Sequence, residues 1–165
     1  VLRVTYTFAV YVSGSSMVDT IHGGDIVYAL RSFNAGRGDI IIIDVSENED
    51  FASGTNNIIK RLIATEGDCV KCVEGVVYVK PAGGEYAALD EPYTKGRTPD
   101  FAEVVVGEGE IFFLGDHRNV SHDSTEVGTV SYSDIIGVVP DWAVSIKGFT
   151  TGWETFRAAV QQLFS

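Results

Sequence analysis

The sequence has no long apolar run and few basic residues, and each shortage excludes a class of protein. No stretch approaches the roughly 20 apolar residues that a membrane-spanning helix needs, and Arg3 interrupts the N-terminal run, so no secretory signal is expected there. Only 12 lysines and arginines stand against 23 aspartates and glutamates, which gives a net charge of −11. This balance argues against a nucleic-acid partner, which needs basic patches, and against docking on anionic lipid by charge alone.

Cysteine is also scarce, and the spacing of Cys69 and Cys72 favours neither a disulfide nor a metal site. Both lie in a segment typical of a strand, where side chains three positions apart point to opposite faces. A zinc site needs two more ligands, and His22, His117 and His122 are not spaced to supply them. We therefore expect two free, half-buried thiols and no metal.

Short runs of β-branched and aromatic residues, separated by clusters of glycine, aspartate and asparagine, predict a mostly β fold. The length of 165 residues suits a β-rich catalytic domain at 1–150 with a real hydrophobic core. A cap insertion is expected at about 74–108, and residues 151–165 predict an amphipathic C-terminal helix that packs on the body of the domain. The expected strands cover residues 4–13, 25–30, 39–45, 58–64, 69–73, 76–79, 110–114, 135–139 and 143–146.

Three polar stretches, in a fixed order, carry residue types suited to peptide-bond hydrolysis. Ser-Met-Val-Asp-Thr-Ile at 16–21 follows the first strand, and Lys60-Arg61 lies inside an apolar run before Gly67-Asp68. Gly-Asp-His-Arg-Asn-Val-Ser-His-Asp-Ser at 115–124 is a dense polar loop after another apolar strand. A serine hydroxyl becomes a nucleophile when a base removes its proton. A lysine can be that base if burial among apolar groups keeps its amine neutral.

These three stretches resemble the sequence boxes of the bacterial type I signal peptidases, and residues 37–41 and 89–93 also look like segments of that family. The resemblance runs from about residue 8 to residue 140. It implies an antiparallel-sheet Ser/Lys protease fold that is related to self-cleaving repressors, and a serine endopeptidase that needs no cofactor. The partners it implies are the signal peptides of secretory preproteins and, through an anchor ahead of the serine box, membrane lipid. This chain would then be an ectodomain on the extracytoplasmic face of the plasma membrane.

The same resemblance assigns roles to individual residues. Ser16 would be the nucleophile, and its backbone N–H would bind the oxyanion. Lys60 would be the general base, and Ser121 would orient its amine through a hydrogen bond. Asp116 would form an ion pair with Arg61 and fix the polar loop against the lysine strand.

Three positions depart from the family pattern or vary within it. Asp123 matches an aspartate that normally has an arginine two residues later, but Thr125 stands there, so Arg118 is the candidate substitute partner. Asp19 replaces a proline in the serine box. Gly14 stands where some relatives carry a serine hydroxyl that helps to bind the oxyanion.

The resemblance also predicts how a substrate would bind. A peptide would add as a strand between the strand before Ser16 and segment 57–59, so that alternate side chains enter the enzyme. The family cleaves after small residues at the first and third positions before the scissile bond. The residues expected to bind the substrate are Val10, Gly14, Met17, Asn57 and Ile58.

Other functions fit part of the pattern. A self-cleaving Ser/Lys protease shares the dyad but lacks the 115–124 loop pattern. A Ser-His-Asp hydrolase would use His117 or His122 as its base. A catalytically weak or inactive relative that binds exported peptides is favoured by the departures at Asp19 and Thr125.

Overall fold

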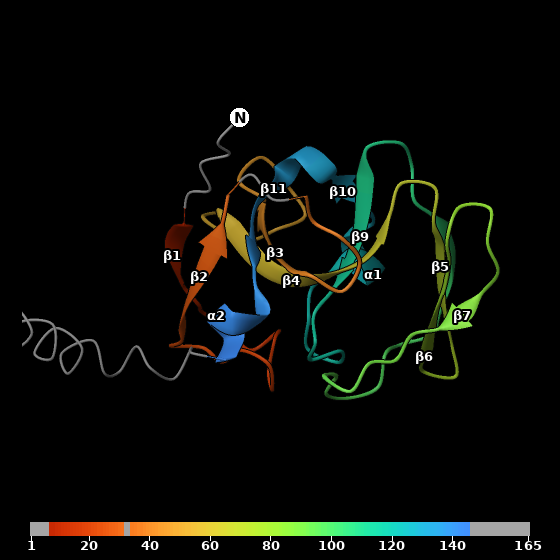
Figure 1. Ribbon diagram of the computed structural model, residues 1–165, viewed down its shortest axis with the longest axis horizontal. Helices are drawn as coiled ribbons and strands as arrows, with labels where there is room; N and C mark the ends of the chain where they lie inside the picture. Colours follow the sequence, from red (N-terminus) through yellow and green to blue (C-terminus); the bar gives the residue numbers. More distant parts are fainter. Residues whose placement is uncertain (1–6, 32–33, 146–165) are drawn as a thin grey trace, which may run out of the picture.

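The computed structural model describes residues 7–31 and 34–145, which form two antiparallel sheets (Figure 1). The larger sheet has seven strands in the order β1-β2-β11-β3-β4-β9-β10, and the smaller has four in the order β7-β6-β5-β8. The predicted mostly β fold is therefore confirmed. The bounds in the larger sheet, in that order, are Thr7–Tyr11, Ile26–Leu30, Ile135–Val139, Ile40–Asp44, Asn57–Thr65, Glu110–Leu114 and Val130–Ser131.

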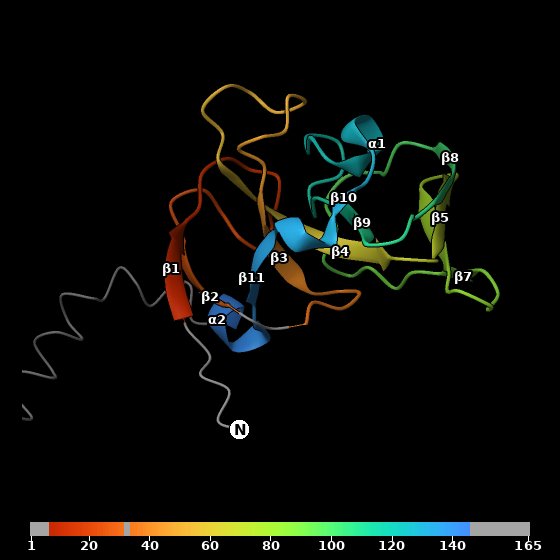
Figure 2. The same ribbon diagram turned by 90° about the horizontal axis from the view of Figure 1, so that it is seen from above.

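The smaller sheet lies beyond one end of β4, on the side of the molecule away from β1 (Figures 1 and 2). Its strands, in spatial order, are β7 (Ala87–Ala88), β6 (Val76–Lys80), β5 (Cys69–Val73) and β8 (Phe101–Val105). This sheet begins at Cys69, five residues before the start expected for the cap. The reason is that β5 pairs with both β6 and β8, so the strand thought to precede the cap lies in the middle of it.

Local sequence explains several of these elements. Four consecutive isoleucines form most of β3, and all four are buried, as expected of a strand covered on both faces. Glu74 and Gly75 join β5 to β6 with φ values of 53° and 84°, and a two-residue hairpin turn of this type needs positive φ at both positions. The predicted hairpin is therefore confirmed.

Two short helices were not predicted from the sequence: one lies where a strand was expected and the other where no regular element was expected. The strand expected at 143–146 is wrong, because α2 (Asp141–Ser145) occupies this segment. Pro140 precedes this helix, and its carbonyl accepts hydrogen bonds from the N–H groups of Ala143 and Val144. The other helix, α1 (Ser124–Val127), was not expected. The C-terminal helix predicted at 151–165 lies outside the described residues.

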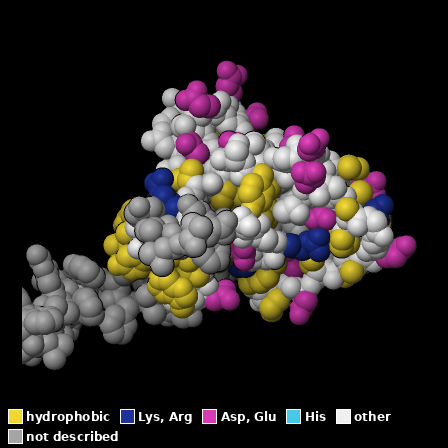
Figure 3. All heavy atoms as spheres, turned by 45° about the horizontal axis from the view of Figure 1, so that its top comes forward, with side chains coloured by type: hydrophobic (Ala, Val, Ile, Leu, Met, Phe, Trp, Pro, Cys, Tyr) yellow, Lys and Arg dark blue, Asp and Glu magenta, His cyan; other side chains and the backbone are white. Residues whose placement is uncertain are grey.

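Both thiols are free, as expected, and both are buried rather than half-buried. No helix in the described ranges is long and apolar enough to cross a membrane. Acidic side chains are scattered over the face seen in Figure 3, with few basic ones between them.

Candidate active site

Residues from β1, at one edge of the larger sheet, and from β4, four places along the strand order, line one pocket of about 210 Å³. Ser16 and Lys60, which are 44 positions apart in the sequence, both line it. Strands β1 and β4 also line it, although β2, β11 and β3 separate them in the sheet, so the sheet must curl to bring them across from one another. The full lining is Val10, Tyr11, Val12, Ser13, Ser16, Ile42, Thr55, Asn57, Ile58, Ile59 and Lys60.

The lysine of this pocket is almost fully buried in β4, with 5% of its surface exposed. Burial lowers its pKa from 10.5 to about 8, and the more distant charges of Asp123 and Asp116 oppose that shift. None of the ion pairs between described residues involves Lys60, so no carboxylate holds the amine in its charged form. The amine therefore has the property that a general base needs, a neutral form accessible near physiological pH.

The serine lies in the turn that follows β1, and the polar loop after β9 holds this turn in place. The carbonyl of Ser16 accepts a hydrogen bond of 2.9 Å from the backbone N–H of His117. Gly115 lies against the same carbonyl, since a Cβ added there would be 2.6 Å from the Ser16 oxygen. Only glycine fits so close to the backbone of the serine turn.

The side chain of Ser121, later in the same loop, also lies against Gly115. A Cβ added to Gly115 would lie 2.2 Å from the Ser121 hydroxyl oxygen. That hydroxyl is buried and has no hydrogen-bond partner within the part of the chain that the structure describes. The hydrogen bond expected between Ser121 and Lys60 is therefore not formed. A buried hydroxyl without a partner is costly, and it is free to bond a substrate or a water molecule.

The expected ion pair between Arg61 and Asp116 is formed. Nε and Nη2 of the arginine donate to the two carboxylate oxygens at 2.8 and 2.6 Å, and the carboxylate is fully buried. The Thr20 hydroxyl donates to the same carboxylate, and the ring of Tyr93 lies under the guanidinium at 3.7 Å. Because Thr20 lies four residues after Ser16 and Arg61 directly follows Lys60, this carboxylate joins the segments that carry the serine and the lysine.

The proposed pairing of Arg118 with Asp123 is wrong. Arg118 instead pairs with Glu91, and both side chains are largely buried. Asp123 accepts from the N–H of Gly115 at 3.0 Å and from the hydroxyl of Thr125 at 2.8 Å, and it caps α1. A carboxylate that accepts several hydrogen bonds needs no arginine, so the threonine itself replaces the missing ion pair.

Two residues expected to bind the substrate lie elsewhere. Met17 is 1% exposed and packs in the core with Val12 and Ile21, so it does not line the pocket. Its side chain faces inward because the turn after Ser16 folds back on the sheet, with the Ile21 N–H donating to the Met17 carbonyl. Gly14, with φ of +84°, is also absent from the lining, and it makes close contact with Gly23.

Val10, Asn57 and Ile58, three of the residues expected to bind the substrate, line the pocket. Sequence reasoning missed Ile42 and Thr55, which also line it. Neither belongs to a polar box: Ile42 lies in β3, and Thr55 lies in the loop before β4.

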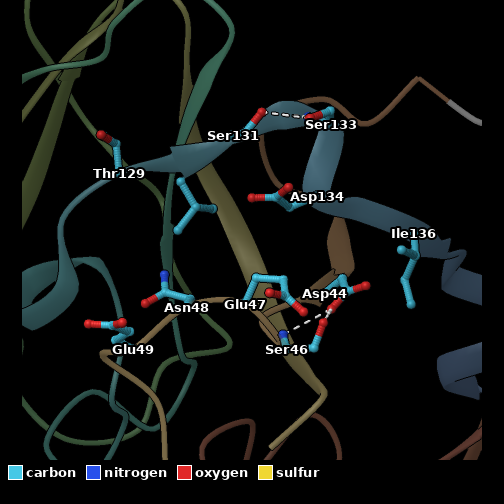
Figure 4. A pocket seen from close by; sticks show the side chains of 11 residues that line it. Asp44, Ser46, Glu47, Asn48, Glu49, Thr129, Ser131, Ser133, Asp134 and Ile136 are labelled. Atoms are coloured by element: carbon cyan, nitrogen blue, oxygen red, sulfur yellow. Dashed lines mark hydrogen bonds between the residues drawn. The ribbon is translucent and has the colours of Figure 1, made fainter.

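A larger hollow of about 530 Å³ lies away from these groups (Figure 4). Its side chains are mostly carboxylates and hydroxyls, among them Asp44, Glu47, Glu49 and Asp134, with neither lysine nor histidine. Within residues 7–31 and 34–145, no group of three His, Cys, Asp or Glu side chains is placed to hold a metal ion. The pocket with Ser16 and Lys60 is therefore the better candidate for catalysis.

Comparison with known proteins decides the family. Residues 1–142 match the family model described as signal peptidase, peptidase S26. The chain belongs to this family. Signal peptidase I of Bacillus caldolyticus is 32% identical over 81% of this chain and 78% of its own length. For signal peptidase I of Bacillus amyloliquefaciens the identity is 31%, over 76% of this chain and 68% of that protein.

The fold agrees with this family. A crystal structure of a signal peptidase I from Enterococcus faecalis V583 is similar, with a TM-score of 0.52 and 27% sequence identity. The match covers 66% of this chain and 98% of that one. As a member of the signal peptidase family, the chain is a serine peptidase, and a Ser/Lys dyad follows from the family.

The buried ion pair of this signal peptidase domain gives a stability prediction. Asp116→Ala is expected to lower the free energy of unfolding by roughly 3–5 kcal/mol, because it leaves the Arg61 charge buried and unpaired. For a domain of this size the melting temperature would fall by roughly 10 °C. Asp19→Ala removes the exposed pair with Lys95 and is the matched control, with an expected change below about 1 kcal/mol. Equal melting temperatures for the two variants would contradict the prediction.

Proposed function

We propose that this domain cleaves signal peptides from exported preproteins, with Ser16 as nucleophile and Lys60 as general base. The observation that carries the proposal is the pocket that Ser16 and Lys60 both line, together with the lowered pKa of the amine. The test is direct: the purified domain, incubated with a secretory preprotein, should release its signal peptide at the expected bond. An intact preprotein after prolonged incubation with a folded domain would contradict the proposal and favour an inactive, peptide-binding relative.

The backbone around the pocket supports binding of the substrate as an added strand. β1 is the edge of the larger sheet. β9 pairs with β4 only from Arg61 onward, so among the described residues no strand pairs with residues 57–60 on that side. Two sets of backbone N–H and C=O groups thus border the pocket, and an extended peptide between them could bond to both.

The chemical steps follow from the proposed roles. Neutral Lys60 takes the proton of the Ser16 hydroxyl, and the oxygen attacks the carbonyl carbon of the scissile bond. The tetrahedral oxyanion is bound by the backbone N–H of Ser16. Collapse breaks the C–N bond, and the lysine ammonium gives its proton to the departing amine. A water molecule, deprotonated by the lysine, then hydrolyses the acyl ester and frees the serine.

The two histidines of the loop are poorly placed to replace the lysine. One ring nitrogen of His117 contacts the Ser15 carbonyl at 3.2 Å. Both ring nitrogens of His122 are engaged, with the Asp50 carbonyl at 2.9 Å and Glu126 at 2.8 Å. Neither histidine lines the pocket with Ser16, so the Ser-His-Asp mechanism has less support than the Ser/Lys one.

Specificity for small residues is expected from the size of the pocket. A preprotein with Phe at the first or third position before the scissile bond should be cleaved about 5- to 150-fold more slowly, the range that 1–3 kcal/mol of steric strain represents. Phe at the second position is the matched control. In an added strand that side chain points away from the enzyme, so cleavage should continue. Initial rates for the three substrates test this, and fast cleavage of all three would contradict it.

We place the proposed reaction at the plasma membrane, with the catalytic domain on the extracytoplasmic face, because the chain belongs to the signal peptidase family. The acidic charge of the chain gives nucleic acid no role in this function.

A further inference from the structure

His117 contacts the backbone on both sides of the nucleophile. Its ring Nδ1 lies 3.2 Å from the carbonyl oxygen of Ser15, and its backbone N–H donates to the carbonyl of Ser16 at 2.9 Å. A carbonyl oxygen only accepts hydrogen bonds, so Nδ1 carries the proton in the first contact. His117 therefore hydrogen-bonds to two consecutive peptide groups, the one between Ser15 and Ser16 and the one between Ser16 and Met17.

The peptide group between Ser15 and Ser16 bears on the proposed catalysis, because it carries the N–H of Ser16. The carbonyl of Ser15 and the N–H of Ser16 belong to the same peptide unit. This unit is not among the cis bonds of the described chain, so its C=O and N–H point in opposite directions. A donor bound to the oxygen fixes the plane of the unit and draws electron density from it, which makes the N–H a stronger donor.

That N–H is available for a ligand. Within the described residues, the Ser16 N–H donates to no protein acceptor, whereas the N–H of Val12 donates to the Asp25 carbonyl. The N–H of Val18 donates to the Ser15 carbonyl at 3.3 Å, so the His117 ring shares this oxygen with one backbone donor. A free N–H next to the attacking oxygen is the group that stabilises the oxyanion in the proposed reaction.

We propose that the His117 imidazole is a positioning residue for the oxyanion site: it holds and polarises the peptide unit whose N–H belongs to Ser16. The inference rests on the proposed function and deepens it. The imidazole acts through the backbone and touches neither substrate nor reacting atoms, so it is no substitute for the base.

The loop itself supports this role, because His117 is held from several directions. Its carbonyl accepts from the N–H groups of Val120 and Ser121 at 3.2 and 3.1 Å. A parallel bridge with Lys95 ties it to the segment before the last strand of the smaller sheet. The backbone of His117 therefore stays in place when its side chain is changed, and the ring can be tested by itself.

Three substitutions of His117 test whether catalysis needs the hydrogen-bond donor at Nδ1 or the imidazole ring as a whole. His117→Ala removes the donor, His117→Asn places an amide N–H donor at the position of Nδ1, and His117→Asp places only acceptors there. The loss of one such hydrogen bond should lower kcat about five- to tenfold, with KM within about twofold. Asparagine should restore most of the rate, and aspartate should be at least as slow as alanine.

His122→Ala is the matched control, since this histidine lies in the same loop but bonds to Asp50 and Glu126 instead of the serine turn. Its kcat should equal that of the unchanged domain. Melting temperatures of all variants should agree within a few degrees, which excludes unfolding as the cause.

The outcomes are distinct. If the unchanged domain does not cleave a preprotein, the proposed function fails. If it does, and the alanine and aspartate variants keep the same kcat, only the positioning role is overturned. A loss that appears in KM instead of kcat would also overturn it, because it would place the ring in substrate binding.

Discussion

Ser16→Ala is expected to reduce the rate of preprotein cleavage by about 10⁴-fold or more, the scale seen when a serine nucleophile is removed. Ser13 and Thr55 also line the pocket. Ser13 precedes the turn that the polar loop holds, and Thr55 lies in the loop before β4, so neither hydroxyl is expected to replace that of Ser16. Rates of signal-peptide release, followed by gel electrophoresis over hours, measure the loss.

Ser15→Ala is the control for this experiment. Its side chain is exposed, and its carbonyl, which contacts His117, is unchanged by the substitution. Activity should therefore remain close to that of the unchanged domain. Cleavage that survives in a folded Ser16→Ala variant would rule out the assignment.

Lys60→Met is expected to abolish cleavage as well, and the rate of the unchanged domain should depend on pH through this amine. Only the neutral amine accepts the serine proton. Because its pKa is lowered to about 8, kcat/KM should rise about tenfold for each pH unit below 8 and level off above it. A profile that levels off near pH 6.5 would instead indicate a histidine base.

Lys60→Met should also raise the free energy of unfolding of the domain at neutral pH. The pKa of Lys60 is about 8 in the folded state and 10.5 without burial, so below pH 8 folding keeps a charged amine in an apolar site. Methionine removes this cost, which is on the order of 3 kcal/mol. Between pH 8 and 10.5 the unfolded chain binds more protons than the folded one. The stability of the unchanged domain therefore rises with pH, and the advantage of methionine shrinks.

Thermal unfolding of both proteins at pH 7 and pH 10 tests this expectation. His122→Ala, in which a partly exposed side chain is removed, is the control and should unfold like the unchanged domain at both values. A methionine variant that is less stable at pH 7, or inactive only because it is unfolded, would contradict the argument.

Most strands could be predicted because their signal is local. β-branched runs such as 40–43 and the alternation after residue 6 depend on near neighbours, and turn residues such as Gly75 separate them. The segment after Pro140 is also rich in apolar residues, yet it is helical. Its Ala143 packs against the core beside β2, and that contact decided between two conformations that the local sequence allows.

The sequence by itself determined the chemistry of this protein: a serine box, a lysine inside an apolar strand and a polar loop, in an order that identifies the family. Only the tertiary structure decided which residues share the pocket, since β1 and β4 meet through the curl of a sheet whose intervening strands lie far apart in the chain. It also decided that Arg118 pairs with Glu91, 27 positions away, and that Met17 is core. Side-chain type and spacing are local properties, whereas sheet curvature and the partner of a buried charge depend on how all the strands pack together.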